Sequence, residues 1–104
     1  AYTAKVDTEA PGWLPVAPEG GLSPFTTTSA TWDGAWPLKP DVVFEGGNAG
    51  RDATGPATMT SLSLLSTGHR PNERLFRTTN ATSAASALCA RMAAEIMGAY
   101  PSLR

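Results

Sequence analysis

Residues 83–100 read SAASALCARMAAEIMGAY, and this stretch carries the clearest local pattern in the chain. Its apolar residues recur at intervals of three and four, which places them on one face of an α-helix: Ala85, Leu88, Cys89, Met92, Ala93, Ile96, Met97 and Tyr100. Arg91 and Glu95 lie four residues apart on the other face, where they can pair. Pro101 ends the pattern. The stretch therefore predicts one amphipathic helix whose apolar face is buried in a core, with Cys89 as inert packing.

The residues before this helix place a serine at its first turn. Segment 79–87 reads TNATSAASA, so Ser83 falls where backbone N–H groups are unpaired and carry a partial positive charge. An oxyanion forming beside Ser83 would meet that residue's own N–H group. The same features fit a simple helix cap by Thr82 or Ser83, and taken alone they favour the cap.

The rest of the chain is richer in turns. Residues 1–48 contain many Pro, Gly, Ser and Thr residues, with the stretch 41–44 (DVVF) as the best candidate strand. Residues 61–65 fit either a strand or one helical turn. Residues 67–72 predict a loop, and Leu75 and Phe76 predict a brief buried stretch.

Composition limits the possible functions. The chain has 104 residues, of which 41% are apolar and 16% charged, whereas ordinary domains carry about 25% charged residues. So short and weakly charged a chain is expected to pack against something else. A net charge of −1 without a basic run argues against nucleic acid, and no stretch is long and apolar enough for a membrane span. The single Cys89 excludes an internal disulfide, and the lone His69 leaves no convincing metal cluster.

Segment 81–87 resembles the nucleophile motif of the subtilases, the subtilisin-like serine proteases, which reads Gly-Thr-Ser-x-Ala-(Ala/Ser)-Pro. The matching residues are Thr82, Ser83, Ala85 and Ser86. Ala81 replaces the usual Gly, and Ala87 replaces the usual Pro. Because glycine at this place supplies backbone freedom, we expect Ala81 to serve only if its φ angle is negative.

Two further segments strengthen the resemblance. Segment 39–43 (KPDVV) is similar to the Lys-Pro-Asp-Val-Val-Ala-Pro-Gly segment of subtilases, with residues 44–46 (FEG) in place of Ala-Pro-Gly. Segment 22–26 (LSPFT) is similar to the family's Ala-Ser-Phe-Ser segment with one residue inserted. All three segments stand in the family's order, so the resemblance covers about residues 22–104.

This resemblance implies an α/β fold with a mostly parallel sheet and a long buried helix after the nucleophile. It implies that residues 1–104 are an incomplete, C-terminal part of a subtilase catalytic domain. It also implies that Ser83 is the nucleophile of an Asp-His-Ser triad, with its backbone N–H in the oxyanion hole. The family's catalytic Asp and His and its oxyanion Asn all precede the matched region, so the chain alone is expected to be inactive and to need the upstream part.

His69 and Asn48 do not fit the remaining catalytic roles. In the family the catalytic histidine and the oxyanion asparagine both come before the Lys-Pro-Asp segment, which removes His69 and Asn48 from those roles. Residues 80–82 (NAT) match the acceptor pattern for N-glycosylation, and this match is interpreted as coincidence.

No cofactor is evident, although the resemblance makes calcium possible. The expected partners are peptide or protein substrates. The isolated chain would expose its apolar helix face, so it is also expected to self-associate. The single cysteine and the lack of a visible signal slightly favour a bacterial cytoplasm.

The alternative function is non-catalytic. A pseudoprotease or an interaction module with a subtilase-like fold would account for Ala81, for Ala87 and for the missing Asp and His. A generic small α/β binding domain is more distant, because it leaves the three ordered segments unexplained.

Overall fold

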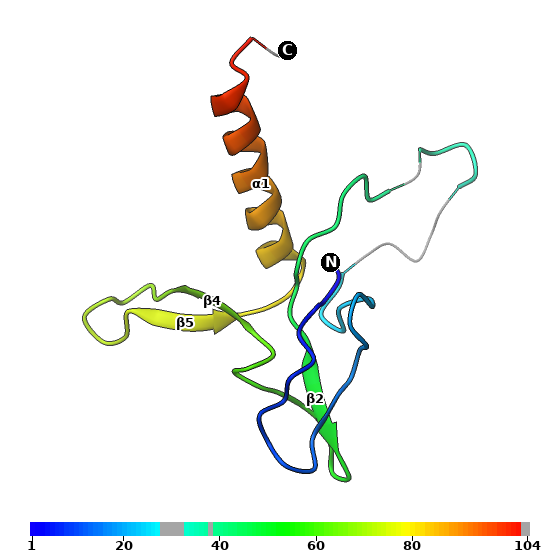
Figure 1. The fold of residues 1–104 in the computed structure, drawn as a ribbon, viewed down its shortest axis with the longest axis vertical. Helices are drawn as coiled ribbons and strands as arrows, with labels where there is room; N and C mark the ends of the chain where they lie inside the picture. Colours follow the sequence, from blue (N-terminus) through cyan, green and yellow to red (C-terminus); the bar gives the residue numbers. More distant parts are fainter. Residues whose placement is uncertain (28–32, 38, 103–104) are drawn as a thin grey trace.

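The computed structural model describes residues 1–27, 33–37 and 39–102. Its elements follow one another as β1 (Leu14–Pro15), β2 (Ala49–Asp52), β3 (Gly55–Thr58), β4 (Leu64–Thr67), β5 (Phe76–Thr79) and α1 (Thr82–Ala99). α1 and the β4–β5 hairpin project in different directions from a small body that holds β1–β3 (Figure 1). The radius of gyration is 16.5 Å, whereas about 13 Å is usual for a domain of this length. The chain therefore buries less of its surface than a self-sufficient domain does.

Both sheets are antiparallel. β1, β2 and β3 form one sheet in that order, and Gly50 of β2 lies opposite Ala57 of β3. The turn between β2 and β3 is closed by Asp52, whose carboxylate accepts hydrogen bonds from the backbone N–H and the hydroxyl of Thr54 (2.8 and 2.6 Å). β4 and β5 form a separate hairpin in which Leu65 lies opposite Thr78.

The expectation of a mostly parallel sheet is wrong for the described residues. Parallel strands need long crossover connections, usually helices, and the helix described here follows the last strand instead of linking two strands. In the part of the chain that the structure describes, parallel pairing is limited to an isolated bridge between Tyr2 and Glu45, in which Tyr2 N donates to Phe44 O (3.0 Å) and Gly46 N donates to Tyr2 O (2.8 Å). The strand expected over residues 41–44 is likewise absent, and Val42 and Val43 are exposed.

The C-terminal helix is confirmed, but its burial is not. α1 spans Thr82–Ala99, and Arg91 Nε donates to Glu95 Oε1 at 2.9 Å as the spacing indicates. Only the first turn is well covered, by burial of Ala84 and Ala85, whereas the apolar residues near the far end are exposed. No described element packs along that outer half, so its apolar face remains open to solvent. Within the described residues, no helix is both long and apolar enough to cross a membrane.

The small core is unusually polar. Its fully buried side chains are Leu62, Asn48, Thr3 and Ser23. Asn48 accepts hydrogen bonds from the N–H groups of Ala17 and Ala49 (3.1 and 2.9 Å) and donates to the carbonyl oxygens of Lys5 and Ala17 (2.7 and 2.8 Å). Because buried polar groups need partners, this one side chain ties the N-terminal segment to β2. The buried stretch expected at residues 75–76 is wrong, since both side chains are exposed.

Candidate active site

The link between β5 and α1 consists of Asn80 and Ala81, and it sets the direction in which the helix leaves the body. Ala81 N donates to Gly46 O at 2.8 Å, which anchors the link to the segment that follows residues 39–43. Ala81 has φ 79° and ψ 179°, a region that essentially only glycine occupies and that costs another residue about 1–3 kcal/mol. The expected negative φ is therefore not found: Ala81, which stands where the motif has glycine, holds a backbone conformation that favours glycine.

Ser83 lies exposed on the first turn of α1. Hydrogen bonding at the helix start comes from the N–H groups of Ala84 and Ala85, which both reach Ala81 O (3.1 and 3.4 Å). The N–H groups of Thr82 and Ser83 precede these donors, so helix geometry leaves them without intrahelical acceptors. No side-chain hydrogen bond caps the helix, so the cap role weighed for Thr82 or Ser83 is wrong.

Thr82 instead connects the helix to a distant segment. Its Oγ1 accepts a hydrogen bond from Thr27 N at 3.0 Å, across 55 positions of the sequence. Thr27 directly follows segment 22–26, so this bond joins the first of the three motif segments to the third.

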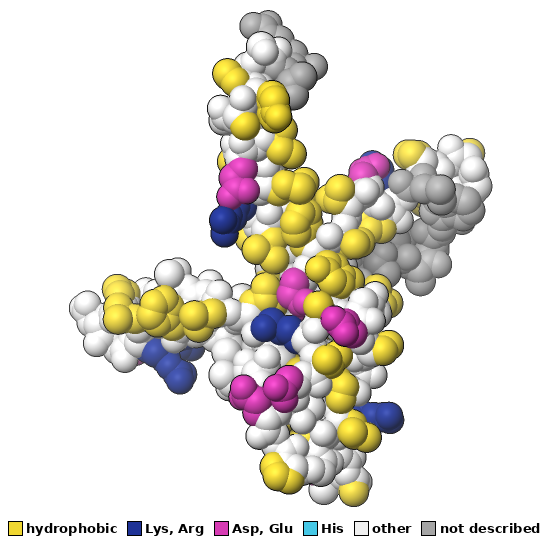
Figure 2. All heavy atoms as spheres, viewed as in Figure 1, with side chains coloured by type: hydrophobic (Ala, Val, Ile, Leu, Met, Phe, Trp, Pro, Cys, Tyr) yellow, Lys and Arg dark blue, Asp and Glu magenta, His cyan; other side chains and the backbone are white. Residues whose placement is uncertain are grey.

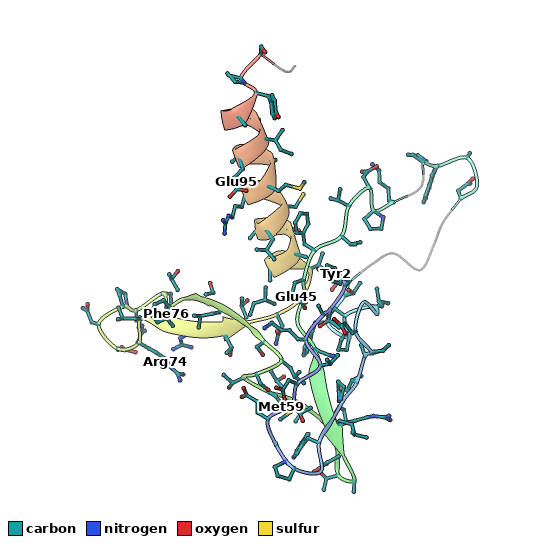
Figure 3. The ribbon with its side chains drawn as sticks, viewed as in Figure 1. Tyr2, Glu45, Met59, Arg74, Phe76 and Glu95 are labelled. Atoms are coloured by element: carbon teal, nitrogen blue, oxygen red, sulfur yellow. The ribbon has the colours of Figure 1, made fainter. Side chains whose placement is uncertain are left out.

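A pocket of about 480 Å³ opens where the three segments meet. It is lined by Ala1, Leu22, Thr26, Thr27, Lys39, Pro40, Asp41, Val42, Val43 and Thr82. A smaller adjoining pocket of about 180 Å³ continues along the helix to Ser86 and Cys89. In Figure 3 Tyr2 and Glu45 lie side by side close to the start of α1, and these two residues form an isolated β-bridge. The lining is mostly aliphatic, with threonine hydroxyls near the helix start.

An ion pair lies on the rim of the larger pocket. Lys39 Nζ binds the Asp41 carboxylate, and both side chains are exposed. The hydrogen bond and then the positive charge of Lys39 lower the pKa of Asp41 below its ordinary value. The rim therefore carries paired charges instead of a free carboxylate that could serve as a base.

His69 lies away from Ser83. It is exposed in the loop that joins β4 to β5. Thr79 is the end of β5 nearest α1, and the pairing of Thr67 with Phe76 puts the loop at the opposite end of the hairpin. Four strand residues separate the two ends by roughly 10 Å, and Figure 1 shows the hairpin pointing away from the helix start.

The two asparagines near the site have structural positions. Asn48 is fully buried, and its side-chain amide makes the four hydrogen bonds to backbone groups described above. It therefore does not face the pocket. Asn80 Nδ2 donates to Ser63 Oγ at 3.1 Å, and its buried Oδ1 has no partner among the described residues. The long-range contacts of these two asparagines could not be found from the sequence, because their partners other than Ala49 lie 17 to 43 positions away.

Comparison with known proteins gives one match. A sequence model described as the subtilase family matches residues 1–104. No curated protein and no solved structure matches the chain.

Proposed function

The chain belongs to the subtilase family, and we propose that it forms part of the catalytic domain of a serine endopeptidase whose nucleophile is Ser83. The observation that carries this proposal is the meeting of three segments at the helix start. Segments 22–26 and 39–43 both line the pocket beside Thr82, the neighbour of Ser83. Both segments end 39 or more positions before Thr82 in the sequence, and a chance resemblance would not require them to meet there.

Peptide-bond hydrolysis makes specific demands on this position. Ser83 Oγ would attack the scissile carbonyl carbon while a histidine takes the hydroxyl proton, and the carbonyl oxygen would become an oxyanion. The N–H of Ser83, free of intrahelical acceptors, can donate to that oxyanion, and the positive end of α1 favours the charge. The histidine then protonates the leaving amine, and water hydrolyses the acyl-enzyme. The mostly aliphatic pocket is lined by Thr82, the neighbour of Ser83, and fits an apolar side chain of the substrate.

The proposal assigns the base and its orienting carboxylate to residues outside this chain. His69 is the single histidine of the sequence and lies on the far end of the hairpin. The expanded shape and the open outer half of α1 fit a chain that packs against further parts of a catalytic domain. In this proposal residues 1–104 bring the nucleophile and one oxyanion donor, and other residues complete the triad.

A peptidase assay tests the proposal. The 104-residue chain and a longer product of the same gene, extended upstream, are compared on a fluorogenic casein substrate. We expect hydrolysis by the longer product only, and its loss by at least a thousandfold in Ser83→Ala. Ser86→Ala is the matched control, because Ser86 lies one turn later on the same helix and the motif accepts either Ala or Ser there; its activity should change less than threefold. Full activity in Ser83→Ala would refute the assignment.

The alternative of a pseudoprotease rests on one observation. Ala81 is held in a glycine conformation immediately before the nucleophile pair, and the strain reduces the stability of the turn that aims Ser83. A well-folded longer product that hydrolyses no substrate would favour this alternative.

A further inference from the structure

The β4–β5 hairpin carries an apolar surface that the proposed peptidase chemistry does not use. Leu65, Leu75 and Phe76 are 71%, 64% and 55% exposed. Hydrophobic side chains run along this arm in Figure 2, with Lys and Arg side chains beside them. A two-stranded hairpin alone is only marginally stable in water. The large exposed apolar surface on this hairpin therefore indicates that it contacts another molecule or segment.

The hairpin is also basic in a chain that is acidic as a whole. It carries Arg70, Arg74 and Arg77 against a single Glu73, while the whole chain has a net charge of −1. Arg70 pairs with Glu73 at 3.1 Å. Arg74 and Arg77 have no ion-pair partner among the described residues. A partner that covers these two unpaired guanidinium groups and the exposed apolar residues beside them would bind best if it carried carboxylates.

The shape of the surface indicates an extended partner. A hollow of about 500 Å³ is lined by the consecutive residues 74–78, which include most of β5, and also by Leu65 of β4 and by Thr60, which precedes the hairpin. β5 pairs with β4 on one side only, so its other edge offers backbone groups to an added strand. Figure 3 places Arg74 and Phe76 together on this arm.

We propose that the β4–β5 hairpin binds an extended acidic peptide segment, which adds as a strand along the free edge of β5. Successive side chains of a strand point to opposite faces, so a segment that alternates apolar and acidic residues meets both requirements. Its apolar side chains cover Leu65 and Phe76, which share one face, and its carboxylates approach Arg77 on the other face and Arg74 at the hairpin end. This binding is independent of Ser83.

Fluorescence anisotropy tests the proposal with the labelled peptide VEVEVEVE and the 104-residue chain. We expect saturable binding that weakens at least threefold between 50 and 300 mM NaCl, and little binding of VKVKVKVK. Arg74→Glu/Arg77→Glu should weaken binding at least tenfold. The matched control, Arg51→Glu/Arg91→Glu, makes the same change in net charge at exposed arginines elsewhere and should change the affinity less than twofold.

Amide chemical shifts keep the test decisive if the charge-reversed variant misfolds. Peptide added to the unmodified chain should shift the amide signals of residues 74–78 more than those of β2 and β3. Equal losses in both charge variants, shifts centred elsewhere, or no binding at 1 mM peptide would each overturn the proposal. It would also be overturned by sedimentation data showing that a second copy of the chain occupies the hairpin and that the peptide does not displace it.

Discussion

Replacing Ala81 by glycine should stabilise the protein, although the greater freedom of glycine in the unfolded chain makes such a replacement destabilising at most positions. Ala81 has φ 79° and ψ 179°, where a Cβ atom is strained. Relief of that strain is worth about 1–3 kcal/mol, and the greater freedom of glycine in the unfolded chain offsets about 0.4–1 kcal/mol. Glycine is also a better N-cap residue than alanine. We therefore expect Ala81→Gly to raise the free energy of unfolding by about 0.5–2 kcal/mol.

Thermal melting followed by circular dichroism measures this effect, and a gain of 1 kcal/mol corresponds to a rise of about 4–8 °C in Tm for a domain of this size. Gly12→Ala is the matched reverse control, because Gly12 has φ 81° and no atom near its absent Cβ. It introduces the strain without a collision and should lower Tm. A fall in Tm for Ala81→Gly would refute the strained geometry at the helix start.

Three further predictions concern the support of the site. Asn48→Ala should destabilise the chain by at least about 3 kcal/mol in urea unfolding, because several buried backbone groups lose their partner; a loss below 1 kcal/mol would contradict this. Gly47→Ala should destabilise through φ +80° and a collision of its Cβ with Asn80 Oδ1, and adding Asn80→Ala should recover only part of the loss. Lys39→Ala should raise the pKa of Asp41 toward 3.8 in an NMR titration, and an unchanged pKa would contradict the pairing. Because the pKa of Asp41 is lowered in the folded chain, the stabilisation by this pair is present above pH 3.8 and is lost as the pH falls through the folded pKa.

Local features of the fold could be predicted from the sequence. The helix at 82–99 follows from side-chain spacing over a single stretch, and the Arg91–Glu95 pair follows from the same spacing. Its burial could not be predicted, because burial depends on what packs against the helix. The prediction of a mostly parallel sheet was wrong, because strand pairing also depends on distant parts of the chain. Within the described residues the parallel bridge between Tyr2 and Glu45 has no helical crossover to extend it.

The candidate site was predictable only in part. The order of segments 22–26, 39–43 and 81–87 indicated that they belong together, and the structure brings them to one pocket. The role of Asn48 depends on Lys5 and Ala17, which no sequence pattern connects to it. The replacement of glycine by Ala81 marked the position as unusual, but the sign of its φ angle came only from the structure.

Covalent labelling of Ser83 is the most direct test of the central claim. The longer gene product is treated with a fluorophosphonate, digested with trypsin and analysed by mass spectrometry. The adduct should lie on Ser83, within the peptide of residues 78–91, and should be absent from Ser83→Ala and from the 104-residue chain alone. An adduct on another serine, or none on a well-folded and peptidase-active product, would contradict the assignment of Ser83 as the nucleophile.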